Sequence, residues 1–420
     1  MNGPAHWLSR RELLLVGSAA VAGGQYVRPS LFRDELDTSF EASTAAWPMP
    51  GRTPRRRGFV PIEDGGITGT AWRTDLDGNF ASEFAVADGT VVVGDSYSSA
   101  DSHELLAFDA ATGTVSWRHG PTTVASAEGY SDGFEGTPAV ADGRVFCPTD
   151  QALQTLDTSG AFEWRLPDLP RLRVGQAFDD TYLPVGSVVF LPDRAGLTAY
   201  DVTSGLRHWV TEDPSLRMAR LSPLASDGNV VYATEAGALH SGPVVAIDAR
   251  DGSERWRTEE IEAEIPDFAL TEDTLLVVGR VKNDGLEYGV VQALDIEDGQ
   301  TRWRVEPDSK LARLVTDGDL VHVFWYDTAL ITLRVDTGEE VWTHAIDGDI
   351  GGVVRTQNSL FCHHDAGVSV FDPETGEVRS RHPLPGGAGE DEVHDIAYAD
   401  GHLFALRDSG LTALEVAVDE

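Results

Sequence analysis

One apolar phrase returns several times along this chain, and it limits the possible fold more than any other feature. The stretch LLAFDAATGTVSWRH at Leu105–His119 has close relatives at Val244–Thr258 and Val291–Val305. Aligned on a Gly-x-x-x-Trp step, successive copies lie roughly 40 to 47 residues apart, a period typical of propeller blades. The step ends at Trp117, Trp164, Trp209, Trp256, Trp303 and Trp342, and at Ser380 in the last full copy.

Each copy contains the same four parts, which together predict a four-stranded antiparallel sheet. A short apolar strand leads into a tight turn, a second strand follows, a third ends in Asp in most copies, and a fourth carries the Trp; Arg334 and Glu415 stand at the Asp position in two copies. An Asp-Gly step between alternating apolar residues is a strong hairpin signal, because glycine accepts a positive φ. The steps are Asp88-Gly89, Asp142-Gly143, Asp227-Gly228, Asp317-Gly318 and Asp400-Gly401.

A ring of such sheets is the predicted fold, because one isolated four-stranded sheet cannot bury both of its faces. Counting the turns gives an all-β, eight-bladed propeller. The strand around Trp72 lacks a blade of its own, and the last blade, which ends at Leu411–Val416, lacks a Trp strand. Pairing these two segments would close the ring and remove its open edge.

The repeated side chains receive structural interpretations. We expect each Trp to fill the space between adjacent sheets. Each repeated Asp is expected to cap the turn after it by accepting bonds from backbone N–H groups. These carboxylates therefore do not indicate active sites; they are Asp109, Asp157, Asp201, Asp248, Asp295 and Asp372.

Two cysteines, Cys147 and Cys362, are the only ones in the chain. They occupy equivalent positions in the predicted second and seventh blades. Blades three steps apart in an eight-membered ring place these residues beyond the roughly 7 Å limit between the Cα atoms of a disulfide. We therefore predict two buried free thiols.

The charge balance is strongly acidic, with 69 Asp and Glu residues against 32 Lys and Arg, a formal net charge of −37. This excess of carboxylates repels nucleic-acid phosphates and anionic lipid surfaces, and we expect neither as a partner. The charge is spread along a chain that is 41% hydrophobic, which argues against disorder. Scarce Lys with abundant Asp and Glu resembles the proteins of salt-loving archaea and predicts poor folding at low salt.

Residues 1–24 are interpreted as an export signal. Arg10 and Arg11 precede an apolar run from Leu13 to Gly24 that is too short to span a bilayer comfortably. The arginine pair resembles the signal read by the twin-arginine system. Ala20-Val21-Ala22 offers a cleavage site, and the sequence leaves open whether the signal is cleaved or kept as an anchor.

Residues 25–61 are expected to combine a flexible tether with a lead-in segment, and residues 62–420 to form the propeller. The stretch from Gln25 to Ala46 is polar and lacks periodicity, which is typical of a tether. The stretch WPMPGRTPRRRGFVP at Trp47–Pro61 follows it as the lead-in.

The copies resemble the PQQ-like repeat of quinoprotein alcohol dehydrogenases and of the bacterial outer-membrane assembly lipoprotein propeller. The shared pattern is D-G-x-V-x-V followed by G-x-L-x-A-L-D-x-x-T-G-x-x-x-W, and it covers about Trp72 to Val416. The segment Trp47–Pro61 is similar to the lead-in of many exported members. One propeller hosts many functions, so the resemblance implies the fold more strongly than any chemistry.

The quinoprotein alcohol dehydrogenases use an adjacent Cys-Cys pair, a Ca²⁺ held by carboxylates and an amide, and a catalytic Asp. This chain has no adjacent cysteines, and the calcium ligands and catalytic Asp cannot be matched residue by residue. We therefore assign no catalytic, cofactor-binding or metal-binding residue, and we expect no cofactor.

Two other stretches were candidates for a metal site. His363-His364-Asp365, placed on a loop after the second strand of the seventh blade, could converge on a metal ion or form a solvated loop tip. The acidic run GEDEVHD at Gly389–Asp395 could hold Ca²⁺ or form solvated surface. In both stretches the solvated alternative is the expectation.

Long irregular segments are expected to line the faces of the ring, where binding usually occurs. They are Gly94–Glu104, Arg118–Gly136 and Gly279–Gly289. Their aromatic residues Tyr130, Phe134 and Tyr288 either contact a partner or pack the loops.

The functional expectation is an exported, monomeric, non-catalytic propeller that binds another protein or a cell-surface component as a scaffold. One alternative is a PQQ-dependent dehydrogenase with a degenerate site, which requires at least three convergent carboxylate or amide oxygens in the channel. Another is a carbohydrate-binding surface protein, which requires exposed aromatic residues on one face of the ring.

Overall fold

The computed structural model describes most of the chain from Leu36 onward. The described residues are 36–40, 43–76, 84–94, 104–120, 137–149, 152–166, 182–192, 196–211, 223–234, 242–258, 261, 263–283, 286–307, 311, 313–324, 329–384 and 391–418. The chain divides into two compact units, Met1–Leu36 and Asp37–Glu420. The predicted export signal lies outside the described residues.

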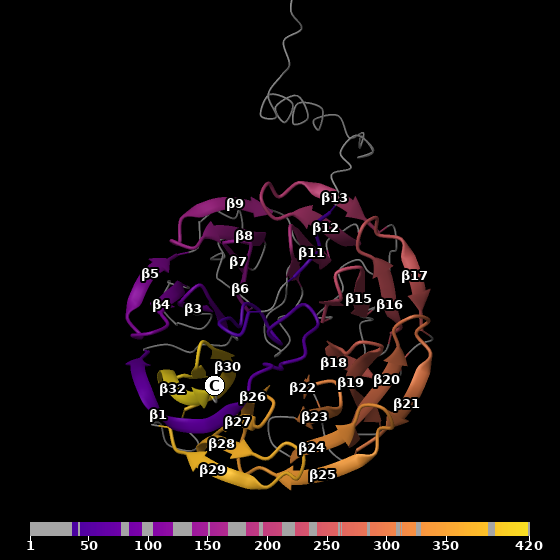
Figure 1. The fold of residues 1–420 in the computed structure, drawn as a ribbon. Helices are drawn as coiled ribbons and strands as arrows, with labels where there is room; N and C mark the ends of the chain where they lie inside the picture. The colour runs from indigo at the N-terminus through magenta and orange to yellow at the C-terminus, as the bar shows by residue number, and fades with distance from the viewer. Residues whose placement is uncertain are drawn as a thin grey trace, which may run out of the picture. The chain divides into compact units, whose positions relative to one another are not determined.

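Every regular element in these residues is a strand, and the strands form eight four-stranded antiparallel sheets arranged as the blades of a propeller (Figure 1). The first strand of each blade lies nearest the central channel. These strands are β2 (Phe84–Ala87), β6 (Ala139–Ala141), β10 (Leu183–Val185), β14 (Ala225–Ser226), β18 (Glu264–Leu270), β22 (Arg313–Thr316), β26 (Ile350–Arg355) and β30 (Val393–Ala399).

The second and third strands of each blade form its middle. The second strands are β3 (Thr90–Gly94), β7 (Arg144–Thr149), β11 (Val188–Pro192), β15 (Val230–Thr234), β19 (Thr274–Asn283), β23 (Leu320–Phe324), β27 (Leu360–His364) and β31 (His402–Arg407). The third strands are β4 (Leu105–Asp109), β8 (Ala152–Asp157), β12 (Leu197–Asp201), β16 (Val244–Asp248), β20 (Leu286–Asp295), β24 (Ala329–Arg334), β28 (Gly367–Phe371) and β32 (Gly410–Val418).

The fourth strands lie on the outer circumference of the ring (Figure 1). They are β5 (Val115–His119), β9 (Phe162–Leu166), β13 (Arg207–Val210), β17 (Glu254–Arg257), β21 (Thr301–Val305), β25 (Glu340–Ala345), β29 (Val378–His382) and β1 (Asp64–Asp75). Alternate exposed and half-buried residues along β5 and β21 show that these strands present one face to solvent.

The ring closes as the sequence predicts. Strand β1 pairs with β32 over a register that runs from Asp64 opposite Val418 to Asp75 opposite Gly410. The eighth blade is therefore completed by the N-terminal strand, in the order β30-β31-β32-β1. This pairing covers an edge that would otherwise expose unpaired backbone groups.

The repeated Trp forms the same contact at seven of the eight junctions between blades. Its indole N–H donates to a backbone carbonyl in the turn between the third and fourth strands of the next blade, at 2.7–3.0 Å. In one example the ring of Trp209 lies against Gly252 in that turn. The prediction that each Trp fills the space between adjacent sheets is confirmed.

Ser380 stands in place of Trp on β29, and the closure explains why. The next blade is the eighth, whose third and fourth strands come from opposite ends of the chain. No turn joins β32 to β1, so an indole at position 380 has no turn carbonyl to reach and no turn glycine to cover.

The predicted turn chemistry is also confirmed. Asp88, Asp142 and Asp400 and the glycines after them all have positive φ, as a type I′ hairpin requires. In six of the blades an Asp at the end of the third strand caps the following turn. For example, the Oδ1 of Asp109 accepts from the N–H of Thr112 at 2.8 Å.

The hydrophobic core lies between neighbouring blades rather than at a single centre. One cluster joins the seventh, eighth and first blades through side chains such as Phe361, Phe404 and Phe108, all of which are buried. The described residues contain no helix long and apolar enough to cross a membrane.

Candidate functional site

The central channel is occupied by the protein's own N-terminal residues, which we call the channel segment (residues 37–40 and 43–62). Described residues from Asp37 to Ala46 were expected to belong to a flexible tether, and this expectation is wrong for those that hydrogen-bond to the ring. The carbonyl of Asp37 accepts from the N–H of Ser187 in the third blade, and the carbonyl of Thr44 accepts from Asp400 in the eighth.

Backbone hydrogen bonds fasten the channel segment to the inner parts of every blade. The remaining contacts are Trp47 with Val86 in the first blade, Pro48 with Val140 in the second, Pro54 with Ser226 in the fourth, Arg55 with Leu270 in the fifth, Arg57 with Thr316 in the sixth, and Gly58 and Val60 with Arg355 in the seventh. The segment therefore satisfies backbone groups that the first strands would otherwise present to the channel.

Two apolar side chains, one on each side of the arginines, anchor the segment. Trp47 is 4% exposed and exchanges both of its backbone hydrogen bonds with Val86 on β2, at 2.7 Å each. Val60 is fully buried and its N–H donates to the carbonyl of Arg355 at 2.8 Å. Both side chains belong to the hydrophobic cluster that joins the seventh, eighth and first blades.

Three consecutive arginines lie between these anchors. The Nη1 of Arg55 donates to the carbonyl of Thr271 at 2.9 Å. The Nε and Nη2 of Arg56 both donate to Oδ1 of Asp267, at 3.2 and 2.9 Å. The Nη2 of Arg57 donates to the carbonyl of Asp317.

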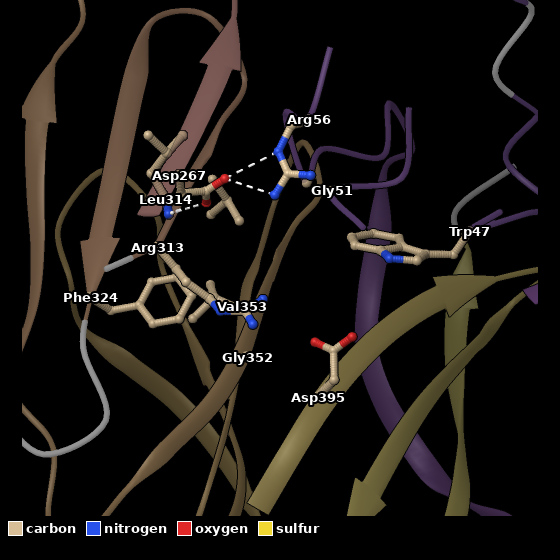
Figure 2. A pocket seen from close by; sticks show the side chains of 12 residues that line it. Trp47, Gly51, Arg56, Asp267, Arg313, Leu314, Phe324, Gly352, Val353 and Asp395 are labelled. Carbon is tan, nitrogen blue, oxygen red and sulfur yellow. Dashed lines mark hydrogen bonds and ion pairs between the residues drawn. The ribbon is translucent and has the colours of Figure 1, made fainter. Parts of the chain in front are cut away.

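Beside this arginine run, a small cavity opens in the channel (Figure 2). Arg313 and Asp395 lie on opposite sides of it, and Trp47 and Arg56 approach from the channel segment. The cavity volume is about 40 Å³. Space of this size holds a few water molecules, whereas small-molecule ligands occupy pockets of about 300–1,000 Å³.

The described residues that line the channel cavity do not fit a quinone with its calcium ion. Asp267 is already committed, because Oδ1 accepts from Arg56 and Oδ2 accepts from the N–H of Leu314 at 3.1 Å. The described residues contain no cluster of three His, Cys, Asp or Glu side chains suited to a metal. Cys147 and Cys362 are buried free thiols in separate blades, as predicted, so they supply no adjacent pair.

The expectation of a solvated loop at His363-His364 is wrong. Both residues belong to strand β27, and both are buried. The Nδ1 of His363 lies 3.1 Å from the carbonyl oxygen of Asp395, and the Nε2 of His364 lies 2.7 Å from Oγ of Ser369. Burial lowers the pKa of both imidazoles, which therefore pack as neutral groups.

The acidic run that ends at Asp395 is also less solvated than expected. Its first two residues lie outside the described part. Asp391 accepts from both the N–H and the Oγ of Ser409, each at 2.7 Å, and Asp395 is 8% exposed. Asp391 therefore contacts the turn between β31 and β32, whereas Asp395 lines the cavity in the channel.

Three aromatic residues were expected either to contact a partner or to pack the loops, and the structure describes one of them. Tyr130 and Phe134 lie outside the described residues. Tyr288 lies on β20, in an extended hairpin with β19, where a loop was expected. Its side chain packs against the cluster between the fourth and fifth blades, which favours a packing role.

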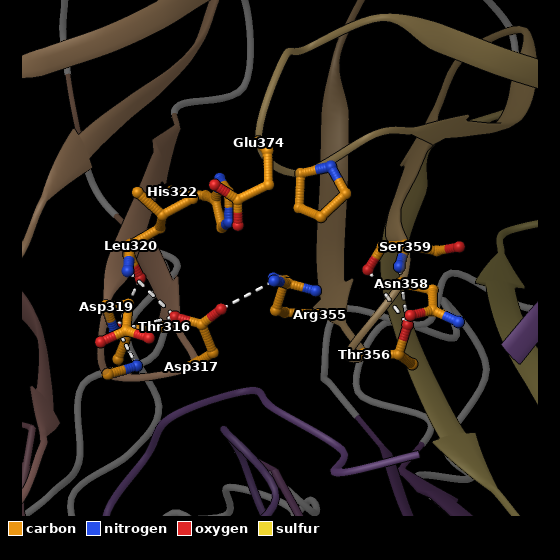
Figure 3. Close-up of polar contacts among 12 residues, drawn as sticks. Thr316, Asp317, Asp319, Leu320, His322, Arg355, Thr356, Asn358, Ser359 and Glu374 are labelled. Atoms are coloured by element: carbon orange, nitrogen blue, oxygen red, sulfur yellow. Dashed lines mark hydrogen bonds and ion pairs between the residues drawn. The ribbon is translucent and has the colours of Figure 1, made fainter. Parts of the chain in front are cut away.

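A second polar cluster joins the sixth and seventh blades beside the channel (Figure 3). Arg355, which is 3% exposed, donates from Nη2 to Oδ2 of Asp317 at 2.7 Å. Burial alone would raise the pKa of Asp317, but the N–H of Leu320 and the Arg355 guanidinium offset this and lower it. Sequence reasoning missed this ion pair, because its partners lie in different repeats.

In the same cluster, His322 on β23 is fully buried and its Nδ1 lies 2.7 Å from Oγ1 of Thr332. Burial lowers its pKa to about 3, and the positive charge of Arg355 acts in the same direction. The imidazole is therefore neutral in the folded protein over most of the pH range.

Solved structures with the same fold cover most of this chain. A BamB from Moraxella catarrhalis matches with a TM-score of 0.57 and 19% identity, over 83% of this chain and 99% of that one. The quinohemoprotein alcohol dehydrogenase from Comamonas testosteroni matches with a TM-score of 0.61 and 16% identity, over 90% and 81%. A computationally designed protein matches with a TM-score of 0.63 and 15% identity, over 84% and 100%.

These identities show a shared fold alone, and the fold is common to a BamB and to dehydrogenases. The comparison with curated protein sequences finds no significant match. The sequence profile described as outer membrane protein assembly factor BamB matches residues 68–236, 171–264 and 240–416, which is most of the chain. The protein is therefore a PQQ-like repeat β-propeller that belongs to the BamB family.

Proposed function

We propose that this protein is an exported, non-catalytic propeller that holds another protein or a cell-surface component as a scaffold. One observation carries the proposal: the channel, where the catalytic alternative requires a polar pocket, holds the chain's own residues. The channel segment forms hydrogen bonds to all eight blades, and the cavity beside it among the described residues has a volume of about 40 Å³.

The family supports this proposal. The matching profile is described as an assembly factor, which names a role in bringing other proteins together. That description also favours the cell envelope as the location, in agreement with the predicted export signal. A rigid ring with a filled channel leaves its outer surface and the connections between blades as places for a partner.

The two alternatives lack corresponding support. A dehydrogenase requires three or more oxygen ligands that converge in the channel. The described cavity is lined by two carboxylates, Asp267 and Asp395. Asp267 lies beside Arg56, and Asp395 lies on the opposite side of the cavity from Arg313 (Figure 2). A carbohydrate-binding protein requires exposed aromatic residues. The exposed large hydrophobic side chains of the described residues are Val115, Phe162, Leu206 and Val418, of which one is aromatic.

A calorimetric titration of PQQ with Ca²⁺ into the full-length protein at molar salt tests the catalytic alternative. We expect no saturable heat, with near-ultraviolet circular dichroism showing that the protein is folded. One-to-one binding would overturn the proposal. In a second arm, chemical crosslinking of intact cells is expected to link the protein to one defined partner, and recovery of the uncrosslinked monomer alone would contradict the scaffold role.

A further inference from the structure

The channel segment is held as a peptide ligand is held, by its backbone and by a few side chains that enter complementary positions. Its backbone bonds reach the first strand or first turn of each blade. The segment crosses from blade to blade around the channel, so it does not add a full strand to any sheet. Among the described residues, its strand-like pairing is limited to the isolated bridges Trp47–Val86 and Phe59–Arg355.

The segment also has a shape of its own. The Nη1 of Arg52 donates to the carbonyl of Phe59 at 2.6 Å, and its Nη2 donates to the carbonyl of Ser43 at 3.0 Å. The N–H of Gly58 donates to the carbonyl of Gly51 at 3.0 Å. Arg52 therefore links two distant parts of the segment, and these contacts within the segment close it into a loop without any contribution from the blades.

Charge gives the site its selectivity. In a chain with a net charge of −37, three adjacent arginines enter the ring where it presents carboxylates. Arg56 meets Asp267, with side-chain exposures of 6% and 10% for the pair. Arg57 lies near Asp317, Asp319 and Glu272, and their charges oppose the lowering of its pKa by burial.

We propose that the channel is a peptide-binding site for a basic segment with apolar ends, and that the channel segment is its tethered ligand. The two apolar anchors, Trp47 and Val60, set the ends, and the arginine run between them meets the acidic fifth and sixth blades. This inference goes beyond the scaffold function, which concerns the outside of the ring.

The occupant is the chain's own segment rather than that of a second copy. Val60 is bonded to Arg355 in the seventh blade, and the carbonyl of Ile62 accepts from the N–H of Gln357 in the same blade. Strand β1 then begins at Asp64 in the eighth blade, which is the neighbouring one. A connection this short cannot reach another molecule.

The test separates the ligand from the ring in the full-length protein. A protease recognition sequence is inserted after Pro61, which is exposed, and the folded protein is cut there. We expect the N-terminal fragment to remain with the ring through size-exclusion chromatography and to dissociate from the folded ring only slowly. Separation of the fragment on the first column would overturn the proposal, whether or not the remaining ring stays folded.

Specificity is tested in the same cut protein. Asp267→Asn removes the charge that meets Arg56, and we expect the fragment to dissociate roughly tenfold faster or more. Asp336→Asn, at an exposed position in the turn before β25, is the matched control and should leave the rate unchanged. Equal rates for the two variants would contradict a charge-selective site.

If Asp267→Asn fails to fold, Arg56→Lys replaces it. This variant keeps the positive charge but loses the two parallel N–H donors of the guanidinium. We expect its fragment to dissociate faster than the unmodified fragment but by less than tenfold. A rate equal to that of the unmodified fragment would contradict the role of Arg56. The PQQ titration uses uncut protein, so the scaffold proposal and this one can fail separately.

Discussion

The guanidinium of Arg56 lies 2.9 Å from the carboxylate of Asp267, and both side chains are almost entirely buried at the centre of the ring. The pair joins the channel segment to the fifth blade. Removal of one partner leaves a buried charge without its counterion, which is far more costly than replacement of both.

Arg56→Ala is therefore expected to lower the free energy of unfolding by about 3–5 kcal/mol. The double variant Arg56→Met with Asp267→Leu should recover most of this loss, because neither charge remains. Urea unfolding, followed by tryptophan fluorescence, measures the free energy of unfolding of the single and the double variant. A double variant as unstable as the single one would show that the pair is not the cause.

The contact between Trp209 and Gly252 tests the junctions between blades. A Cβ atom at Gly252 would lie 2.6 Å from the indole ring, at a φ of +75°. Gly89 is the matched control, because its φ is +71° and nothing lies within 4 Å of the added atom. Both Gly→Ala changes carry a left-handed backbone cost of about 1–2 kcal/mol.

Gly252→Ala should cost about 1–3 kcal/mol more than Gly89→Ala, because the indole must also move. Thermal unfolding of the two variants gives the difference directly. Equal losses would mean that the glycine is required for its backbone conformation alone.

Much of this architecture is predictable from the sequence, because each blade repeats the same local signals. The Asp-Gly turns, the capping Asp and the spacing of Trp residues predict the blades, and Trp72 predicts the closure. Ser380 looks like a lost Trp in the sequence, and only the closure shows that its partner turn does not exist.

The channel could not be predicted in the same way, because its contacts join segments far apart in the chain. A polar stretch without periodicity looks like a tether, yet Asp37 and Thr44 bond to the third and eighth blades. Three successive arginines in an acidic chain were the available signal. His363 was expected on a loop, whereas β27 continues through His364 and β28 begins at Gly367, so only two residues separate the strands.

Acid is expected to destabilise the fold through His322. Its pKa of about 3 lies below the usual 6.5, so the unfolded chain binds a proton that the folded protein excludes. Stability is then complete above pH 6.5 and falls as the pH drops from 6.5 towards 3, by about 1.4 kcal/mol per pH unit from this group.

His322→Gln removes this contribution while keeping a polar side chain near Thr332. Between pH 5.5 and 4, the free energy of unfolding of the variant, measured with urea, should fall with a slope smaller by about 1.4 kcal/mol per pH unit. His363 and His364 contribute in the same direction in both proteins, so the difference isolates His322. Identical slopes would show that His322 is protonated in the folded state.

The net charge of −37 predicts a strong dependence of stability on salt. The screening length falls from about 10 Å at 0.1 M salt to about 3 Å at 1 M, which weakens repulsion among surface carboxylates. Thermal unfolding should therefore occur at higher temperature as NaCl increases. Glu297→Gln, Glu339→Gln and Glu415→Gln together, all at exposed positions, should reduce the dependence; an unchanged slope would assign the effect to something other than charge.

The most direct test of a filled channel is hydrogen exchange of the intact protein. The N–H groups of Trp47 and Val60 are bonded to the first and seventh blades, so peptides that contain them should exchange as slowly as those from β2 and β26. Exchange of residues 44–62 at the rate of an unstructured peptide, beside protected blades, would show an open channel and contradict the account.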